Sequence, residues 1–175
     1  MMRRADCCPR RYPADGTAPD PDGPGVVARP PRIYLAFTAL GLALHWLRPV
    51  ALLPAGTPPA LGYAAGGVLA GLGVAIMAIA VRQFRRAGTN VETPKPATAL
   101  VTDGLYRWSR NPMYLSLTLI YAGVAAAANS LWLAALLLPL LAVMRYGVIA
   151  REERYLAGKF GGGYHAYTTS VRRWL

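Results

Sequence analysis

The sequence predicts an all-α integral membrane protein with about four transmembrane helices. The chain of 175 residues is 54% hydrophobic and only 15% charged, and its apolar residues gather in long runs. Its net charge of +11 is divided among three clusters that alternate with those runs. A basic chain can bind nucleic acid, but charges divided in this way follow the loops of a membrane protein. We therefore expect the protein to lie in a membrane and to have no nucleic-acid partner.

Residues 1–31 precede the first apolar run and are rich in proline, glycine, aspartate and arginine. Such a segment lacks the apolar residues needed to build a core, which predicts a disordered cytoplasmic tail. Residues 32–175 form the predicted membrane domain. The two cysteines, Cys7 and Cys8, are adjacent and lack the spacing of zinc ligands, so no metal site is predicted.

Four apolar runs follow the tail, and each is expected to cross the membrane. They cover residues 33–53, 61–81, 113–128 and 131–150. A helix rises about 1.5 Å per residue, so about 20 residues cross a bilayer. Only Asn129 and Ser130 connect the last two runs, which predicts a helical hairpin. The third run is short for a span, and we expect it to begin within residues 110–112 or to tilt little.

Positive charges predict the orientation of these runs. Arginine and lysine lie in the tail, between the second and third runs, and after the fourth. The other two connections, residues 54–60 and 129–130, hold no charge, and Arg48 is the one exception to the asymmetry. Because positively charged loops stay in the cytoplasm, both termini are expected there. Nearly all the basic residues are arginine, which together with abundant alanine and glycine suggests a GC-rich bacterial genome. We therefore expect the protein in the inner membrane of a bacterium.

The second run is rich in glycine. Its five glycines are Gly62, Gly66, Gly67, Gly71 and Gly73. Two pairs have the small-xxx-small spacing that lets helices approach closely. This pattern predicts close packing within the chain or in a homodimer, and a glycine face that admits a flat ligand is the alternative.

Polar functional groups concentrate in two segments on the predicted cytoplasmic side. One is "GTNVETPKPATALVTDGLYRWSRNPMY", residues 88–114, and the other is "RYGVIAREERYLAGKFGGGYHAY", residues 145–167. Because the third and fourth runs are antiparallel, the start of one lies beside the end of the other. The segment around Arg110 is therefore expected to face Glu152 and Glu153.

Each of these groups also has a structural interpretation. The aromatic residues could form a belt at the membrane interface, and Asn111 and Pro112 could cap the third helix. Glu152 and Glu153 could pair with neighbouring arginines on a solvated helix end. However, only these two of the eight acidic residues lie beyond residue 103. The two glutamates and the segment around Arg110 are expected on the same face of the membrane, and this coincidence favours a functional site.

The two segments resemble a known family. "LVTDGLYRWSRNPMYLS" followed by "EERYLAGKFGGGYHAY" is similar to the isoprenylcysteine carboxyl methyltransferases and the related phospholipid N-methyltransferases. Their pattern is G-x-Y-x-x-x-R-H-P-x-Y, an apolar hairpin, then E-E-x-x-L, F-G and two tyrosines three apart. The match covers roughly residues 85–173. The matching positions are Gly104, Tyr106, Arg110, Pro112, Tyr114, Glu152, Glu153, Leu156, Phe160, Gly161, Tyr164 and Tyr167.

The resemblance implies a membrane methyltransferase that uses S-adenosyl-L-methionine, bound by a cytoplasmic C-terminal segment. The acceptor would be a lipid or a lipidated molecule, such as an isoprenoid or prenyl carboxylate or a phospholipid. The resemblance implies catalytic roles for Arg110, Glu152 and Glu153. The residues that it implies for cofactor binding are Ala99, Leu100, Val101, Gly104, Tyr106, Asn111, Pro112, Met113, Tyr114 and Glu152.

Two positions depart from the family pattern. Asn111 stands where eukaryotic members carry histidine, and because asparagine cannot ionise, we expect it to bind rather than to transfer protons. Val148 stands where the eukaryotic carboxyl methyltransferases carry an arginine that contacts the substrate. Arg145 and Arg151, one turn to either side, are therefore the candidate substrate-binding residues.

Two other classes of protein remain open at this stage. A membrane NADPH-dependent reductase of the sterol-reductase type shares an R-x-P-x-Y element, although the glutamate pair after the hairpin favours methyl transfer. A small four-helix transporter or anchor would place ionisable groups near mid-membrane. Only His45, Arg48 and Arg145 lie within the apolar runs.

Overall fold

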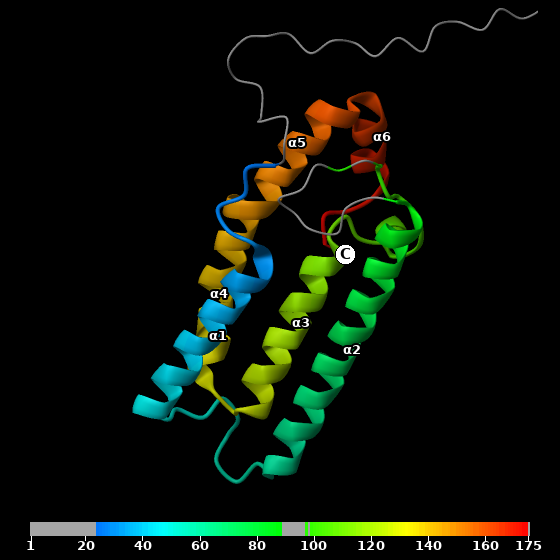
Figure 1. Cartoon of the computed structure of the whole chain (residues 1–175). Helices are drawn as coiled ribbons and strands as arrows, with labels where there is room; N and C mark the ends of the chain where they lie inside the picture. The colour runs from blue at the N-terminus through cyan, green and yellow to red at the C-terminus, as the bar shows by residue number, and fades with distance from the viewer. Residues whose placement is uncertain (1–23, 89–96, 98, 175) are drawn as a thin grey trace, which may run out of the picture.

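The computed structural model describes residues 24–88, 97 and 99–174, and over these residues the chain is helical and contains no strand. Four helices form an elongated bundle (Figure 1). They are α1 (Pro30–Leu47), α2 (Pro59–Arg86), α3 (Pro112–Ala127) and α4 (Leu131–Val143). The predictions that concern Cys7, Cys8 and residues 1–23 lie outside the described residues.

From α4 the chain continues through a π-helical turn, η2 (Met144–Ile149), into α5 (Ala150–Phe160). Gly161 then takes a positive φ of 51°, and α6 (Gly162–Ser170) changes direction. A 3₁₀ turn, η1 (Gly104–Arg107), precedes α3. These elements gather at one end of the bundle, here named the α5 end, while the α1–α2 and α3–α4 connections form the opposite, hairpin end (Figure 1).

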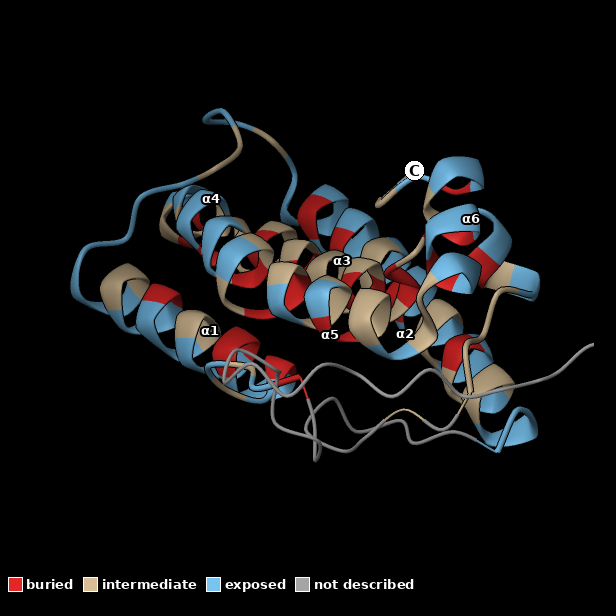
Figure 2. Cartoon of the chain, turned by 90° about the horizontal axis from the view of Figure 1, so that it is seen from above, coloured by how far each residue is buried: buried red, intermediate tan, exposed pale blue. Residues whose placement is uncertain are grey.

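The outer surface of the bundle is apolar. Among the described residues, two helices are long and apolar enough to cross a membrane: α2 and the continuous helix Leu131–Phe160. In the most apolar stretch of each helix, only 17% of α2 and 28% of Leu131–Phe160 is buried inside the protein. The core helix of a soluble protein, in contrast, is mostly buried. Large hydrophobic side chains such as Leu35, Val68 and Leu138 point outward instead. Buried residues lie where helices face one another (Figure 2). These features indicate a membrane protein.

The ends of α1 and α2 differ from the ends of the predicted spans. α1 ends at Leu47 and not near residue 53, because Arg48 precedes Pro49 and takes an extended conformation with φ −142°. α2 continues past residue 81 to Arg86. α3 begins at Pro112, within the predicted interval, and its 16 residues rise about 24 Å, less than the roughly 30 Å of a bilayer core. Membrane crossing by α1 and α3 stays a prediction.

The tight turn between α3 and α4 is confirmed. Asn129 has a positive φ of 45°, and its side-chain Oδ1 accepts hydrogen bonds from the N–H groups of Leu52 (3.0 Å) and Leu53 (2.8 Å). Ser130 caps α4, accepting a bond from the N–H of Leu133 (3.4 Å). One asparagine therefore makes the hairpin turn and fastens the α1–α2 connection to it.

Close helix packing through the glycines of α2 occurs within the chain. A Cβ atom on Gly66 would lie 2.6 Å from the carbonyl oxygen of Gly123, and one on Gly73 would lie 2.7 Å from that of Ser116. Only glycine permits so close an approach of α2 to α3. Gly67 and Gly71 lie on another face and meet no atom within 4 Å. A second copy of the chain could pack against this open face, and the homodimer stays a prediction.

The segment from residue 24 to residue 29 packs along η2 and the start of α5. The N–H of Val27 donates to the carbonyl oxygen of Gly147 (3.3 Å), and Arg151 Nη1 donates to that of Gly25 (2.8 Å). Pro24 is buried. This part of the predicted tail is therefore held at the α5 end of the bundle.

Candidate functional site

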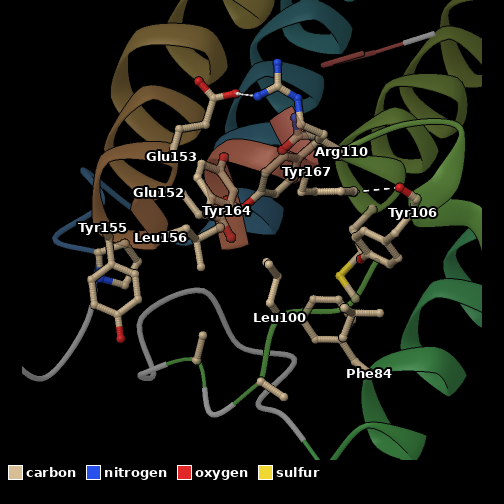
Figure 3. A pocket seen from close by; sticks show the side chains of 17 residues that line it. Phe84, Leu100, Tyr106, Arg110, Glu152, Glu153, Tyr155, Leu156, Tyr164 and Tyr167 are labelled. Carbon is tan, nitrogen blue, oxygen red and sulfur yellow. Dashed lines mark hydrogen bonds and ion pairs between the residues drawn. The ribbon is translucent and has the colours of Figure 1, made fainter. Parts of the chain in front are cut away.

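A cavity lies at the α5 end, between α2, α3, α5, α6 and the segment before α3 (Figure 3). The space inside it and in its open mouth is together about 870 Å³. The residues that line it are Pro24, Phe84, Ala97, Ala99, Leu100, Val101, Tyr106, Arg110, Asn111, Met113, Tyr114, Glu152, Glu153, Tyr155, Leu156, Tyr164 and Tyr167.

Glu152 gives the cavity a carboxylate with spare hydrogen-bonding capacity. The hydroxyl of Tyr114, on the first turn of α3, donates a bond of 2.7 Å to Glu152 Oε2. Within the described part of the chain, Glu152 forms no ion pair. A carboxylate keeps further acceptor positions after one such bond. Glu152 is therefore able to accept hydrogen bonds from a cationic group or a hydroxyl in the cavity.

Glu153, in contrast, is held by two arginines. Arg173 donates from Nε to Oε1 and from Nη2 to Oε2, each at 2.8 Å, and Arg110 Nη1 lies 3.3 Å from Oε1. The hydrogen bonds to Glu153 raise the pKa of Arg173 above its usual value. Such two-pronged pairs fix geometry as well as charge. Arg110 Nε is buried and has no partner among the described groups.

The C-terminal residues 171–174, here named the C-terminal strap, cross the start of α3. The backbone N–H of Arg110 donates to the carbonyl oxygen of Arg172 (3.0 Å). Asn111 Nδ2 donates to the carbonyl oxygen of Arg173 (3.0 Å), which also accepts a longer bond of 3.4 Å from Ser109 Oγ. The motif before α3 therefore positions the strap, and the Asn111 side chain has a binding partner in the chain itself.

Tyrosines form much of the cavity wall. Tyr106 is buried against Phe84, with ring centroids 5.2 Å apart. The hydroxyl of Tyr167 donates to the carbonyl oxygen of Tyr106 (2.6 Å), which joins α6 to η1 (Figure 3). Burial raises the pKa of Tyr106, Tyr164 and Tyr167, and nearby carboxylates add to this effect for Tyr106 and Tyr164. These phenols therefore remain protonated at neutral pH and act as hydrogen-bond donors.

Gly104 shapes the wall without lining it. Its φ is +60°, and a Cβ atom there would collide with the side chain of Gln83. Glycine is therefore needed where η1 approaches α2. Pro112 is buried as the first residue of α3 and likewise does not line the cavity.

The structure brings together most of the predicted site residues. Those that line the cavity are Ala99, Leu100, Val101, Tyr106, Arg110, Asn111, Met113, Tyr114, Glu152 and Glu153. Arg145 instead lines a separate groove, and Arg151 is exposed and bound to Gly25. The prediction that the motif before α3 faces the glutamate pair is confirmed by the Tyr114–Glu152 and Arg110–Glu153 contacts. The roles given to these residues stay predictions.

Several residues of the site were not predicted. Arg173 was counted only among the charges that orient the chain, and its separation of 20 residues from Glu153 gives no local signal. Phe84 and Tyr155 line the cavity from the end of α2 and from α5. Phe84 lies three residues beyond the predicted end of the second run. A prediction that extended this helix by one turn would have placed Phe84 near the site.

The fold and the cavity define a helical membrane protein with a polar site at one end of its bundle. Residues 61–162, or 102 of the 175 residues, match the family model described as phospholipid methyltransferase. The chain therefore belongs to the phospholipid methyltransferase family, and the predicted resemblance is confirmed. An uncharacterized protein from Haemophilus influenzae is 49% identical over 65 residues, which are 36% of this chain and 100% of that protein. No solved structure matches the chain.

Proposed function

We propose that the protein is a membrane methyltransferase that uses S-adenosyl-L-methionine to methylate a lipid-soluble acceptor at the cytoplasmic interface. Family membership supports a membrane methyltransferase in general. The observation that carries the rest is the convergence of the two motifs on one cavity, through the Tyr114–Glu152 hydrogen bond and the Arg110–Glu153 ion pair.

The residues of the cavity fit the chemical groups of S-adenosyl-L-methionine. The acceptor capacity of Glu152 suits its ammonium group or ribose hydroxyls, and the carboxylate balances its positive charge. The buried Arg110 Nε, which lacks a partner among the described groups, suits a carboxylate. Phe84 and Tyr106 offer aromatic surface for a base.

Held by Glu152 and Arg110, S-adenosyl-L-methionine would supply a sulfonium-activated methyl group for transfer to the acceptor. Positioning of the reactants provides several kcal/mol of the acceleration, on the order of magnitude measured for oriented reactions. The apolar and aromatic walls of the cavity would shield the bound reactants from water in part. Both oxygens of Glu153 are bound by guanidinium groups, so its role is to anchor Arg110. Glu152 or water would take the proton of an amine acceptor.

The orientation follows from the charges. The described basic residues of the three clusters lie at the α5 end, and the hairpin end carries Arg48 alone within the described connections. Both termini and the cavity would therefore face the cytoplasm of a bacterial inner membrane, with α1 and α3 crossing beside α2 and α4. A polar, cytosolic methyl donor and a lipid-soluble acceptor can meet only at such an interface.

Isothermal titration calorimetry of the purified protein tests the proposal. We expect S-adenosyl-L-methionine to bind, and Glu152→Gln to weaken binding by about tenfold or more, since a charge-assisted hydrogen bond contributes at least about 1.4 kcal/mol. Arg154→Gln changes an exposed residue of the same helix and is the control. Binding of NADPH without S-adenosyl-L-methionine would favour the reductase alternative, and binding of neither would favour a transporter or anchor.

A further inference from the structure

Glu153 is shared unequally between two arginines. Arg173 binds both of its oxygens, at 2.8 Å each, whereas Arg110 Nη1 reaches only Oε1, at the longer distance of 3.3 Å (Figure 3). A carboxylate that one guanidinium holds in a two-pronged pair has little capacity left for a second. The three groups carry two positive charges and one negative charge, so Glu153 balances the charge of Arg110 only in part.

Arg110 lines the cavity and is well shielded from solvent. Its side chain is 15% exposed, and its Nε is buried with no partner among the groups that the structure describes. Burial raises the pKa of the Tyr164 phenol, and the charge of Arg110 and its hydrogen bond with that phenol oppose the rise. A shielded guanidinium whose charge is balanced only in part favours an anionic ligand.

The backbone of Arg173 is fixed by the same motif that contains Arg110. Asn111 Nδ2 donates to the carbonyl oxygen of Arg173, and the backbone N–H of Arg110 donates to that of Arg172, each at 3.0 Å. The C-terminal strap and the start of α3 are therefore joined on both sides of the arginine pair. From this common base the two guanidinium groups reach Glu153 on α5.

Loss of the Arg173 side chain would change the partners of Arg110. Both oxygens of Glu153 would then be free, and a free carboxylate accepts a two-pronged pair from a neighbouring guanidinium. Arg110 is the neighbour that already touches Oε1. Such a pair would balance the charge of Arg110 and occupy donors that now remain available to a ligand.

We propose that Arg173 is a positioning residue for the methyl donor: by occupying Glu153, it keeps Arg110 available for the carboxylate of the donor's amino-acid group. This inference rests on the proposed function for the identity of the ligand. Arg173 is not among the described residues that line the cavity, so it acts through Glu153 and Arg110. Glu152, on the same helix as Glu153, is the acceptor for the ammonium of that amino-acid group.

Calorimetry with two donors measures this role without relying on activity. The probes are S-adenosyl-L-methionine and its decarboxylated form, which keeps the sulfonium, the amine and the nucleoside but lacks the carboxylate. We expect the purified native protein to bind S-adenosyl-L-methionine about tenfold tighter than the decarboxylated form. Arg173→Gln should reduce this ratio to about twofold and leave the affinity for the decarboxylated form unchanged. Arg172→Gln, at the exposed neighbouring residue, is the control and should change neither affinity.

Two further variants separate positioning from a general effect on structure. Arg173→Lys keeps the charge but cannot form the two-pronged pair, so the ratio of the two affinities should be intermediate. In a Glu153→Gln background, Arg173→Gln should cause no further change in that ratio, because Arg173 acts through Glu153.

The outcomes that would overturn the inference are distinct from those that reject the proposed function. Equal weakening of both donors by Arg173→Gln would show a structural role alone and would overturn the inference. Equal binding of the two donors by the native protein would also overturn it, even where Arg173→Gln does not fold. Failure of the native protein to bind either donor would instead reject the proposed function.

Discussion

The pair between Arg173 and Glu153 predicts a stability effect that can be worked out from its geometry. Replacement by Arg173→Gln removes two charge-assisted hydrogen bonds of 2.8 Å. Hydrogen bonds to charged groups contribute about 1.5–3 kcal/mol when buried. The side chains are only partly shielded, with 31% of Arg173 and 19% of Glu153 exposed, so solvent screening reduces this figure. Glu153 also keeps Arg110 at 3.3 Å. We therefore expect a loss of about 1–2 kcal/mol.

Thermal unfolding in detergent measures this loss. For a chain of this length, about 1–2 kcal/mol corresponds to a decrease in Tm of roughly 2–8 °C. The matched control is Arg172→Gln, which makes the same change at the neighbouring residue, whose side chain is exposed. Its Tm should change by less than about 1–2 °C, as is usual for surface substitutions. Equal shifts for the two variants would refute the reasoning, because a general effect of charge would then explain both.

Three further predictions concern packing, the N-terminal segment and topology. Gly66→Ala should destabilise the protein by about 1–3 kcal/mol in the same unfolding assay, because its Cβ would meet the backbone of α3, whereas Gly67→Ala should not, because its face is open. Deletion of residues 2–22 should preserve the affinity for S-adenosyl-L-methionine in calorimetry. Deletion of residues 2–28 should weaken this affinity by about fivefold, because the longer deletion removes Pro24 from the cavity wall and the hydrogen bond of Val27 to Gly147. Reporter fusions after residues 56 and 175 should report the periplasm and the cytoplasm, respectively. A periplasmic C-terminus would contradict the orientation.

The hairpin and the meeting of the two motifs were predictable because both follow from local sequence. A connection as short as Asn129 and Ser130 forces two apolar runs to lie antiparallel, and the start of α3 must then lie beside the end of the other helix. The contact of Tyr114 with Glu152 and that of Arg110 with Glu153 are direct consequences. These contacts depend on chain connectivity, which the sequence displays.

Other features depend on contacts that no local pattern specifies. The C-terminal strap reaches the site only because α6 reverses direction after Gly161, and so Arg173 could not be assigned to Glu153 from spacing. Arg145 and Arg151 were placed around Val148 on the assumption of regular α-helix. The π-helical turn η2 changes the helix register between them, and the two arginines lie in different surroundings. The end of α1 at Leu47 could have been predicted from Pro49.

Transfer of label from methyl-labelled S-adenosyl-L-methionine into lipid tests the central claim most directly. Membranes that contain the overproduced protein are incubated with the labelled donor and extracted with organic solvent, beside membranes that contain Glu152→Gln. We expect label in the organic extract from the native protein, and strongly reduced label from the variant. Release of that label as methanol in mild base would identify a carboxyl ester, and resistance to base would identify N- or C-methylation. Label above background only in water-soluble products, or equal lipid labelling by the variant, would contradict the account.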